Sequence, residues 1–202
     1  MLIESSAPTR IDLAGGTLDI WPIYLFHEGA QTLNAAISLR AHCTIHPRAD
    51  KRIAIESADT GRRVEADHWS DLRDNHDLEL LGRLLHFFQA EGLELRTRCD
   101  SPFGAGIAGS SALNIAVCGA LAAWCERPLT ADELLQIAQN VEAQVIDVPT
   151  GVQDYRPAYY GGISAVELNV DGVRRVAMPV QASDLERRIV LAYTNASRNS
   201  GI

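Results

Sequence analysis

The chain has 202 residues, of which 47% are hydrophobic and 22% charged, a composition typical of a globular protein with one domain and room for part of another. Its net charge of −8 argues against nucleic acid or an anionic membrane surface as a partner of the whole molecule. Four cysteines without metal-site spacing, and an N-terminus without an apolar signal segment, predict a reduced, cytoplasmic protein.

The sequence predicts mostly strands in the first hundred residues. β-Branched and apolar residues dominate three runs, which we expect to form separate strands at residues 32–39, 41–48 and 52–58. Apolar residues then recur at helical spacing from Leu78 to Phe88, which predicts an amphipathic helix of about three turns. The alternating run at 93–99 predicts a strand that leads directly into a glycine-rich stretch.

Two helices and three strands are predicted in the second half. The first helix begins near Ser110 and continues through an apolar run. The second begins at Thr130, where Glu133 three residues later completes a capping box, and it ends near Ile146. The strands are predicted within residues 163–169, 173–180 and 188–195.

The glycine-rich stretch SPFGAGIAGSS, residues 101–111, lies between a predicted strand and a predicted helix. Glycines let the backbone approach an anion, and the N–H groups at a helix N-terminus favour negative charge. The serines that open the helix offer hydroxyl groups to a Mg²⁺ ion held by phosphate oxygens. No GK[ST] follows the glycines, so this is not a Walker loop. On this stretch alone, a phosphate-binding loop and a simple packing turn both stay open.

Two further segments carry charged residues beside turns. Glu142, on the second helix, could complete a metal site, although most glutamates on helices are solvated. Asp154, in the loop after that helix, could meet a substrate hydroxyl group or form an Asx-turn. Arg10 and Asp19 flank the Gly15–Gly16 turn, where they suit a polyol phosphate or form an ordinary surface ion pair.

Together these segments resemble three motifs of the GHMP kinases, the family of galactokinase, homoserine kinase and mevalonate kinase. SPFGAGIAGSSAL resembles the family's phosphate loop P-x-G-x-G-L-G-S-S-S-A, with Ile107, Ala108 and Gly109 in place of Leu, Gly and Ser. APTRIDLAGG resembles its N-terminal motif, and GVQD the segment that carries its catalytic aspartate. The resemblance spans about residues 7–164. It implies an α+β fold of the GHMP kinase N-terminal domain type (ribosomal protein S5 domain 2-like), a mixed sheet with helices packed on it.

The resemblance also implies a kinase that uses ATP and Mg²⁺. Ser110 and Glu142 would bind Mg²⁺, and Asp154 would orient or deprotonate the attacking hydroxyl group. Arg10 would steady the transferred phosphoryl group. The loop residues that would wrap the ATP phosphates are Gly104, Ala105, Gly106, Ile107, Ala108, Gly109, Ser110 and Ser111.

On the acceptor side, the resemblance implies that Asp19, Gly16 and Thr17 bind a sugar or sugar phosphate. Galactokinases carry a Glu where Gly16 stands, which argues against galactose. The Gly–Gly pair and the segment GVQDYRPAYYGG resemble the heptose-phosphate kinase and fucokinase branches instead, although Tyr155 replaces a Gln of the heptose kinases. The alternative is a catalytically inactive sugar- and nucleotide-binding module, or sensor, derived from such a kinase.

We expect residues 1–185 to form the ATP-binding domain and 186–202 to begin a truncated second domain, because family members continue into one. The chain therefore reads as a fragment of a kinase, or as a short product that is inactive. Arg198 is a candidate phosphate or sugar contact. The expected partners are a sugar or sugar phosphate, ATP and a second copy of the chain in a homodimer.

Overall fold

The sheet is organised around one long strand, β2 (Gln31–Pro47), in the computed structural model, which describes residues 1–73 and 75–196. β1 (Ile3–Ala14) pairs antiparallel along one edge of β2. On the other edge, β5 (Leu93–Cys99) and β6 (Ile163–Asn169) pair antiparallel with opposite ends of β2. The long β2 therefore joins two halves of the sheet.

Three further strands extend the sheet. β3 (Ile53–Ser57) runs parallel to β5 and pairs antiparallel with β4 (Arg62–Ala66). β7 (Gly172–Ala177) pairs antiparallel with β6. The seven-stranded sheet has the order β4-β3-β5-β2-β6-β7, with β1 beside β2. Because it contains both kinds of pairing, the sheet is mixed, which confirms the predicted α+β class.

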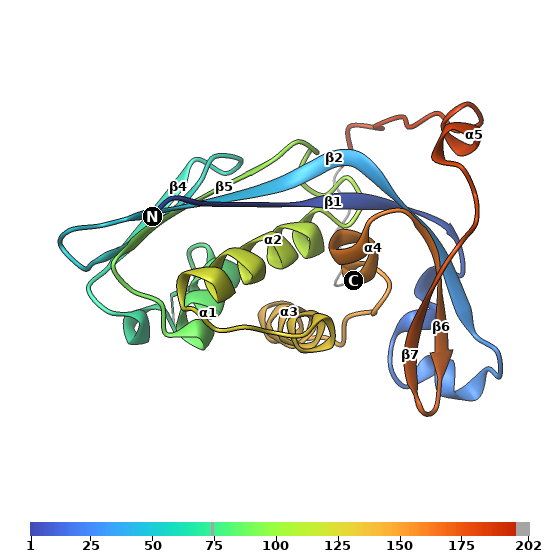
Figure 1. Ribbon diagram of the computed structural model, residues 1–202, viewed down its shortest axis with the longest axis horizontal. Helices are drawn as coiled ribbons and strands as arrows, with labels where there is room; N and C mark the ends of the chain where they lie inside the picture. The colour runs from blue at the N-terminus through green and yellow to red at the C-terminus, as the bar shows by residue number, and fades with distance from the viewer. Residues whose placement is uncertain (74, 197–202) are drawn as a thin grey trace.

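Four helices cover one face of this sheet (Figure 1): α1 (Glu79–Phe88), α2 (Gly109–Trp124), α3 (Ala131–Ile146) and the short α4 (Tyr155–Tyr160). α2 runs beneath β1 and β2, and α3 packs on α2 from the side away from the sheet. α2 is thereby covered on several sides, which explains why its sequence is apolar nearly all round. No helix within residues 1–73 and 75–196 is long and apolar enough to cross a membrane.

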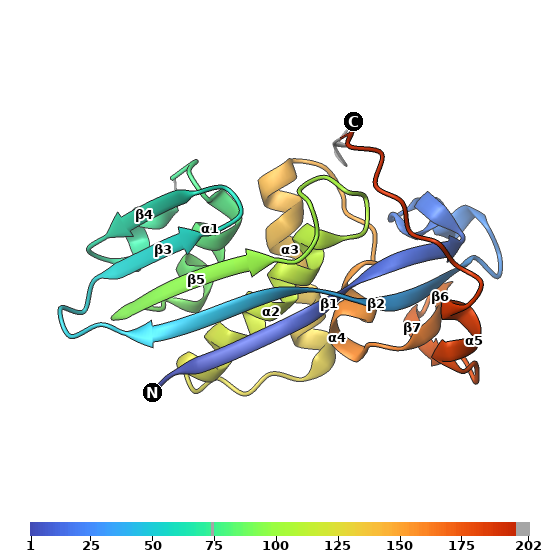
Figure 2. The same cartoon turned by 90° about the horizontal axis from the view of Figure 1, so that it is seen from above.

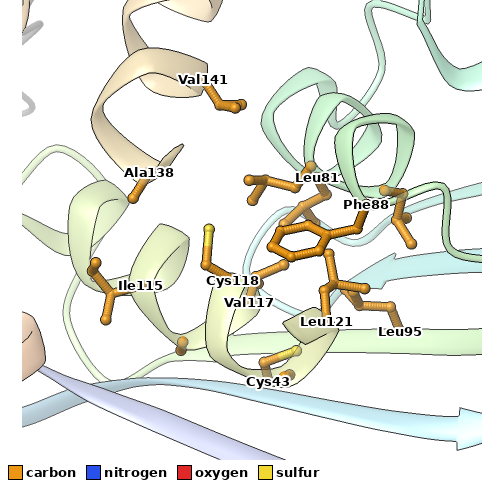
Figure 3. Close-up of a cluster of buried hydrophobic side chains, with 14 of the residues drawn as sticks. Cys43, Leu81, Phe88, Leu95, Ile115, Val117, Cys118, Leu121, Ala138 and Val141 are labelled. Atoms are coloured by element: carbon orange, nitrogen blue, oxygen red, sulfur yellow. The ribbon is translucent and has the colours of Figure 1, made fainter. Parts of the chain in front are cut away.

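The hydrophobic core fills the space between the sheet and α1–α3 (Figure 3). Leu121 and Val117 of α2 are fully buried there, against Phe88 of α1. Burying a side chain of this size contributes about 1.5–3 kcal/mol relative to leaving it in water. The core therefore fixes α2 against the sheet, and with it the position of the glycine-rich loop that precedes the helix.

The capping box predicted at the start of α3 is confirmed. The Thr130 hydroxyl group accepts a hydrogen bond from the Glu133 N–H at 3.3 Å, and the Glu133 carboxylate accepts one from the Thr130 N–H at 2.8 Å. These bonds satisfy donors that an α-helix leaves unpaired in its first turn. The helix begins at Ala131 and ends at Ile146, as the pattern indicated.

Some elements differ from the sequence prediction. The two strands expected at 32–39 and 41–48 are one strand, because no glycine or proline interrupts the chain between them. The strand expected at 188–195 is wrong: no neighbouring strand pairs with it, and Val190 is 93% exposed. β4 and α4 were not predicted. Arg198 lies outside the described residues, and the division at residue 185 stays a prediction.

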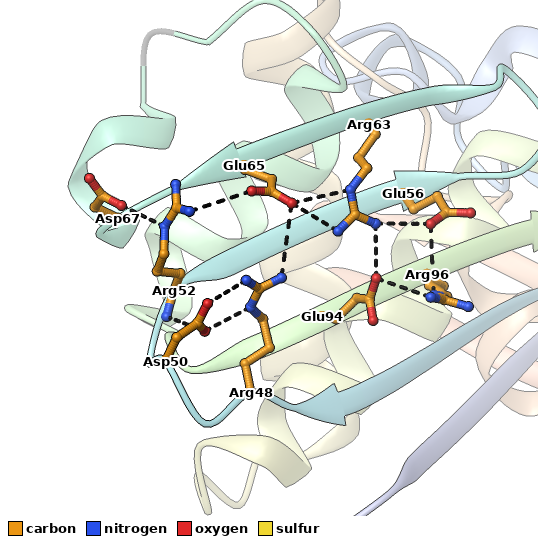
Figure 4. Close-up of polar contacts among 9 residues, drawn as sticks. All are labelled: Arg48, Asp50, Arg52, Glu56, Arg63, Glu65, Asp67, Glu94 and Arg96. Atoms are coloured by element: carbon orange, nitrogen blue, oxygen red, sulfur yellow. Dashed lines mark hydrogen bonds and ion pairs between the residues drawn. The ribbon is translucent and has the colours of Figure 1, made fainter.

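The opposite face of the sheet is charged. Arg63 of β4 contacts Glu56 of β3, Glu65 of β4 and Glu94 of β5 with N–O distances of 2.9–3.1 Å (Figure 4). The chain after β7, which includes α5 (Ala182–Glu186), passes over the same side of the molecule (Figures 1 and 2). The sheet therefore buries one face and presents a polar one.

Candidate active site

The glycine-rich loop ends at the N-terminus of α2, as predicted. The first backbone bond of this helix runs from the Ala112 N–H to the Ala108 carbonyl group, at 3.0 Å. The N–H groups of Gly109, Ser110 and Ser111 precede that bond and have no partner within the helix. Ala108 occupies the N-cap position and its side chain cannot cap it. The helix therefore presents free donors and the positive end of its dipole, which suits a phosphate group.

The loop backbone turns sharply just before this helix. Gly106 has a φ of +76°, and a Cβ atom there would meet nothing within 4 Å. Ala108 has a φ of +58°, in the left-handed region that residues with a Cβ atom rarely adopt. Gly104, with a φ of +70°, is left-handed as well, so the loop changes direction several times before the helix, and Ser110 in its first turn is exposed.

Arg10 of β1 joins this loop to the segment before α4. Its Nε and Nη2 atoms donate to Oδ1 of Asp154 at 2.8 and 2.5 Å, and its Nη1 atom donates to the Gly106 carbonyl oxygen at 3.3 Å. Its backbone N–H donates to the Ile107 carbonyl group at 3.1 Å. The Arg10 side chain is only 12% exposed, so the ion pair is shielded from water on most sides. Through Arg10, all three sequence motifs are therefore in direct contact.

The segment that follows Arg10 contacts the residues before α4 as well, through Asp19 at the end of the short 3₁₀ helix η1 (Gly16–Asp19). Asp19 is 2% exposed, and its Oδ2 accepts a hydrogen bond from the Gln153 N–H at 2.8 Å. Burial raises the pKa of Asp19 to about 6, the nearby charge of Asp154 adds to the rise, and the bond from Gln153 opposes it. A carboxylate with so little water around it is a strong hydrogen-bond acceptor.

The remaining predicted acceptor residues lie in the same turn. The Gly16 carbonyl oxygen accepts a hydrogen bond from Nε2 of Gln153 at 2.7 Å. Thr17 is exposed, in the first turn of η1. In this turn, Thr17 therefore faces solvent, whereas Gln153 holds the Gly16 carbonyl group and the Asp19 carboxylate.

Glu142 of α3 lies beside the first turn of α2. Its Oε2 accepts hydrogen bonds from the Ser111 hydroxyl group at 3.1 Å and from the Tyr155 hydroxyl group at 2.8 Å. Burial raises the pKa of Glu142, whereas hydrogen bonds from the hydroxyl groups of Ser110, Tyr155 and Ser111 lower it. The charge of Asp154 raises it further, which places Asp154 near Glu142 as well as near Asp19.

These contacts bring together most of the residues that the sequence singled out. The loop, Arg10, Asp154, Asp19 and Glu142 meet where β1, α2, α3 and α4 converge. Carboxylate and hydroxyl oxygens, as on Glu142 and Ser110, are the ligands that Mg²⁺ prefers, so this donor set fits the ion.

Three contributors were not recognised from the sequence. Gln153 and Gly151 lie against Asp19, and Tyr155 bonds to Glu142. Their position within three residues of Asp154 is the signal that could have drawn attention to them. Glutamine, glycine and tyrosine are also ordinary packing residues, so the chain pattern alone does not reveal which carboxylate each one contacts.

Comparison with known proteins places the chain among kinases of similar sequence and fold. Residues 77–162 match the family described as GHMP kinases N terminal domain. The D-glycero-alpha-D-manno-heptose 7-phosphate kinase of Campylobacter jejuni is 33% identical over 209 residues, which cover 98% of this chain and 61% of that protein. The chain thus spans about three fifths of this relative's length.

Solved structures of known kinases have the same fold. A D-glycero-D-manno-heptose 1-phosphate kinase from Bacteriodes thetaiotaomicron superposes with a TM-score of 0.81 at 27% identity, over 92% of this chain and 62% of that one. Lactococcus lactis galactokinase complexed with galactose gives a TM-score of 0.70 at 22% identity, over 89% of this chain and 48% of that one. At that identity the second likeness concerns the fold alone.

Proposed function

Because the chain belongs to the GHMP kinase family through its N-terminal domain, we propose that it binds ATP with Mg²⁺ and a phosphorylated sugar as acceptor. The reaction would transfer the γ-phosphoryl group of ATP to a hydroxyl group of a heptose phosphate or a similar sugar. In that transfer the hydroxyl group loses its proton, its oxygen bonds to the γ-phosphorus, and the bond from that phosphorus to ADP breaks.

The observation that carries this proposal is the position of Arg10. Its guanidinium group contacts Asp154 and the Gly106 carbonyl oxygen together, so one cation lies between a candidate phosphate loop and a candidate acceptor-activating carboxylate. Phosphoryl transfer depends mainly on positioning and on charge stabilisation, and a cation at that point serves both. A purely structural ion pair would not need the loop contact.

On the nucleotide side, the loop from Gly104 to Ser111 would hold the phosphate oxygens with its backbone N–H groups. Ser110 and Glu142 would hold Mg²⁺, which neutralises phosphate charge when it is bound. The hydrogen bonds from Ser111 and Tyr155 both reach Oε2 of Glu142, so they fix the orientation of its carboxylate.

On the acceptor side, Asp19 would accept hydrogen bonds from sugar hydroxyl groups. Asp154 would accept one from the hydroxyl group that reacts, and would aim its oxygen at the γ-phosphorus. Arg10 would hold Asp154 in place and stabilise negative charge on the transferred group. The names of the two similar heptose kinases support a phosphorylated heptose as the acceptor to test first.

The test is an ADP-release assay on the purified chain with Mg²⁺, ATP and one acceptor at a time: D-glycero-D-manno-heptose 7-phosphate, the 1-phosphate, fucose and galactose. We expect release above background with a heptose phosphate. Asp154→Asn should lower kcat by about 10²-fold or more, because it removes the carboxylate that orients the hydroxyl group. The affinity for ATP should change little.

The matched control is Asp171→Asn, the same substitution in the exposed turn between β6 and β7. It should leave kcat unchanged. Turnover that survives in Asp154→Asn would remove the role given to this residue. A wild-type chain that binds ATP and heptose phosphate, yet releases no ADP, would instead be the inactive binding module.

A further inference from the structure

Gln153, the residue before Asp154, is bonded to both ends of the η1 turn. Its backbone N–H donates to Oδ2 of Asp19 at 2.8 Å, and its side-chain Nε2 donates to the Gly16 carbonyl oxygen at 2.7 Å. The residue is 7% exposed, so neither bond competes freely with water. One residue therefore holds the first and the last residue of the turn.

Residues near Gln153 also hold the η1 turn against the segment that precedes Asp154. Ile20 and Gly151 form an antiparallel bridge. A Cβ atom built on Gly151 would overlap the carboxylate of Asp19, so only glycine fits there without a shift. The η1 turn and the segment 151–154 are therefore in direct contact at Asp19 and at the residue after it.

The Gln153 side chain has a feature that packing alone does not account for. Its Oε1 is buried and has no hydrogen-bond partner among the described residues. A buried acceptor without a partner destabilises the folded chain, which offsets much of what the Nε2 bond contributes. A methionine side chain of similar length would fill the same space without either polar group. The amide therefore contributes more to the geometry of the turn than to stability.

We infer that Gln153 is a positioning residue that fixes the separation between Asp19 and Asp154, and through it the affinity for the acceptor sugar. The inference rests on the proposed function, in which Asp19 binds sugar hydroxyl groups and Asp154 orients the one that reacts. The backbone bond to Asp19 and the Ile20–Gly151 bridge hold only the end of η1, so without the bond to Gly16 the start of the turn can shift relative to Asp154. A sugar could then satisfy one carboxylate or the other but not both, whereas the nucleotide site has no contact with this bond.

The test compares Gln153→Met with Gln139→Met in the full chain. Gln139 of α3 also donates its Nε2 to a backbone carbonyl group, that of Thr150 just before this segment, at 3.2 Å, but it has no bond to Asp19 or Gly16. The measurements are calorimetric binding of D-glycero-D-manno-heptose 7-phosphate without nucleotide, binding of a Mg²⁺-bound non-hydrolysable ATP analogue, the melting temperature, and KM and kcat.

We expect Gln153→Met to weaken heptose phosphate binding and raise its KM about tenfold. ATP-analogue affinity should stay within twofold and the melting temperature within a few degrees, and Gln139→Met should match the wild type.

A second variant keeps the test decisive if Gln153→Met does not fold. Gln153→Glu keeps the shape of the side chain but places a carboxylate oxygen against the Gly16 carbonyl oxygen, so heptose phosphate binding should weaken by more than in Gln153→Met. Unchanged heptose phosphate binding in both variants would overturn the inference while leaving the proposed function in place. An equal loss of sugar and nucleotide affinity would also overturn it, since the residue would then be structural. A wild-type chain that binds neither ligand would overturn the inference and the proposed function together.

Discussion

At the scale of the residue, Asp19 is a carboxylate that is almost completely buried. Its protonation therefore couples ligand binding to pH. Burial is the main reason that the pKa of Asp19 rises from 3.8 to about 6. An acid whose pKa is higher in the folded than in the unfolded chain binds more protons when folded between those values. The free energy of unfolding therefore falls as the pH rises from about 4 through 6, and the loss is complete about one pH unit above the folded pKa. The charged form that suits sugar hydroxyl groups is thus the less stable one.

Asp19→Asn removes this charge and keeps an oxygen that can accept the bond from Gln153. We expect the variant to increase the free energy of unfolding by about 1–3 kcal/mol at pH 8 and by very little at pH 4. Urea unfolding at the two pH values measures the difference. Asp171→Asn, in the exposed β6–β7 turn, should show no such dependence on pH. An equal gain at pH 4 and pH 8 would mean that the cause is packing and not charge.

At the scale of the element, the start of α2 contains a strained residue. Ala108 has a φ of +58°, and a Cβ atom in this region costs about 1 kcal/mol. The GHMP phosphate loop that the sequence resembles has glycine at this point. Ala108→Gly should therefore increase the free energy of unfolding by about 0.5–1 kcal/mol, measured as a higher urea midpoint with an unchanged slope.

Ala105→Gly is the matched control, because Ala105 belongs to the same loop and is not among the left-handed residues. There the added backbone freedom of the unfolded chain should lower the stability. The two substitutions are chemically identical and should act in opposite directions. If both lower the stability, the left-handed conformation of Ala108 is not a source of strain.

Elements whose signal is local were predictable from the sequence. The spacing of leucines marked α1, and the Thr130–Glu133 pair marked the start of α3. The wrong strand at 188–195 shows the limit of such signals, since an apolar run forms a strand only where another strand offers its hydrogen bonds. α4 is six residues long with Pro157 in its first turn, and such a short helix depends on packing for its stability.

The candidate site, too, could be predicted only in part from the sequence. The three motifs could be located, because glycine, arginine and carboxylate residues at those spacings resemble a known pattern. Their contacts depend on the tertiary structure: Gln153 and Asp19 are 134 residues apart in sequence. Nothing near Gln153 in the chain indicates that its amide reaches Gly16, so the residue was found only from the fold.

At the scale of the whole molecule, the sheet has one face under helices and one charged face (Figures 1 and 4). Arg63 is central to the charged face, since it contacts Glu56, Glu65 and Glu94. Its hydrogen bonds lower the pKa of Glu65 and of Glu94. The stability that these two groups contribute is therefore present above their ordinary value of 4.5, and it is lost as the pH falls below that value.

Arg63→Gln would remove the one cation that contacts all three carboxylates and leave each with fewer partners, Arg96 beside Glu56 and Glu94, and Arg48 and Arg52 near Glu65. We expect a lower melting temperature at low ionic strength, and we expect the loss to shrink in about 0.5 M salt, because salt screens repulsion between exposed charges. Arg62→Gln is the matched control: the neighbouring side chain makes one longer ion pair, with Asp77 at 3.6 Å, and should change the melting temperature much less. A loss that is the same at both salt concentrations would mean that Arg63 acts through packing of its aliphatic stem. The charge of Arg63 would then not contribute to holding these strands together.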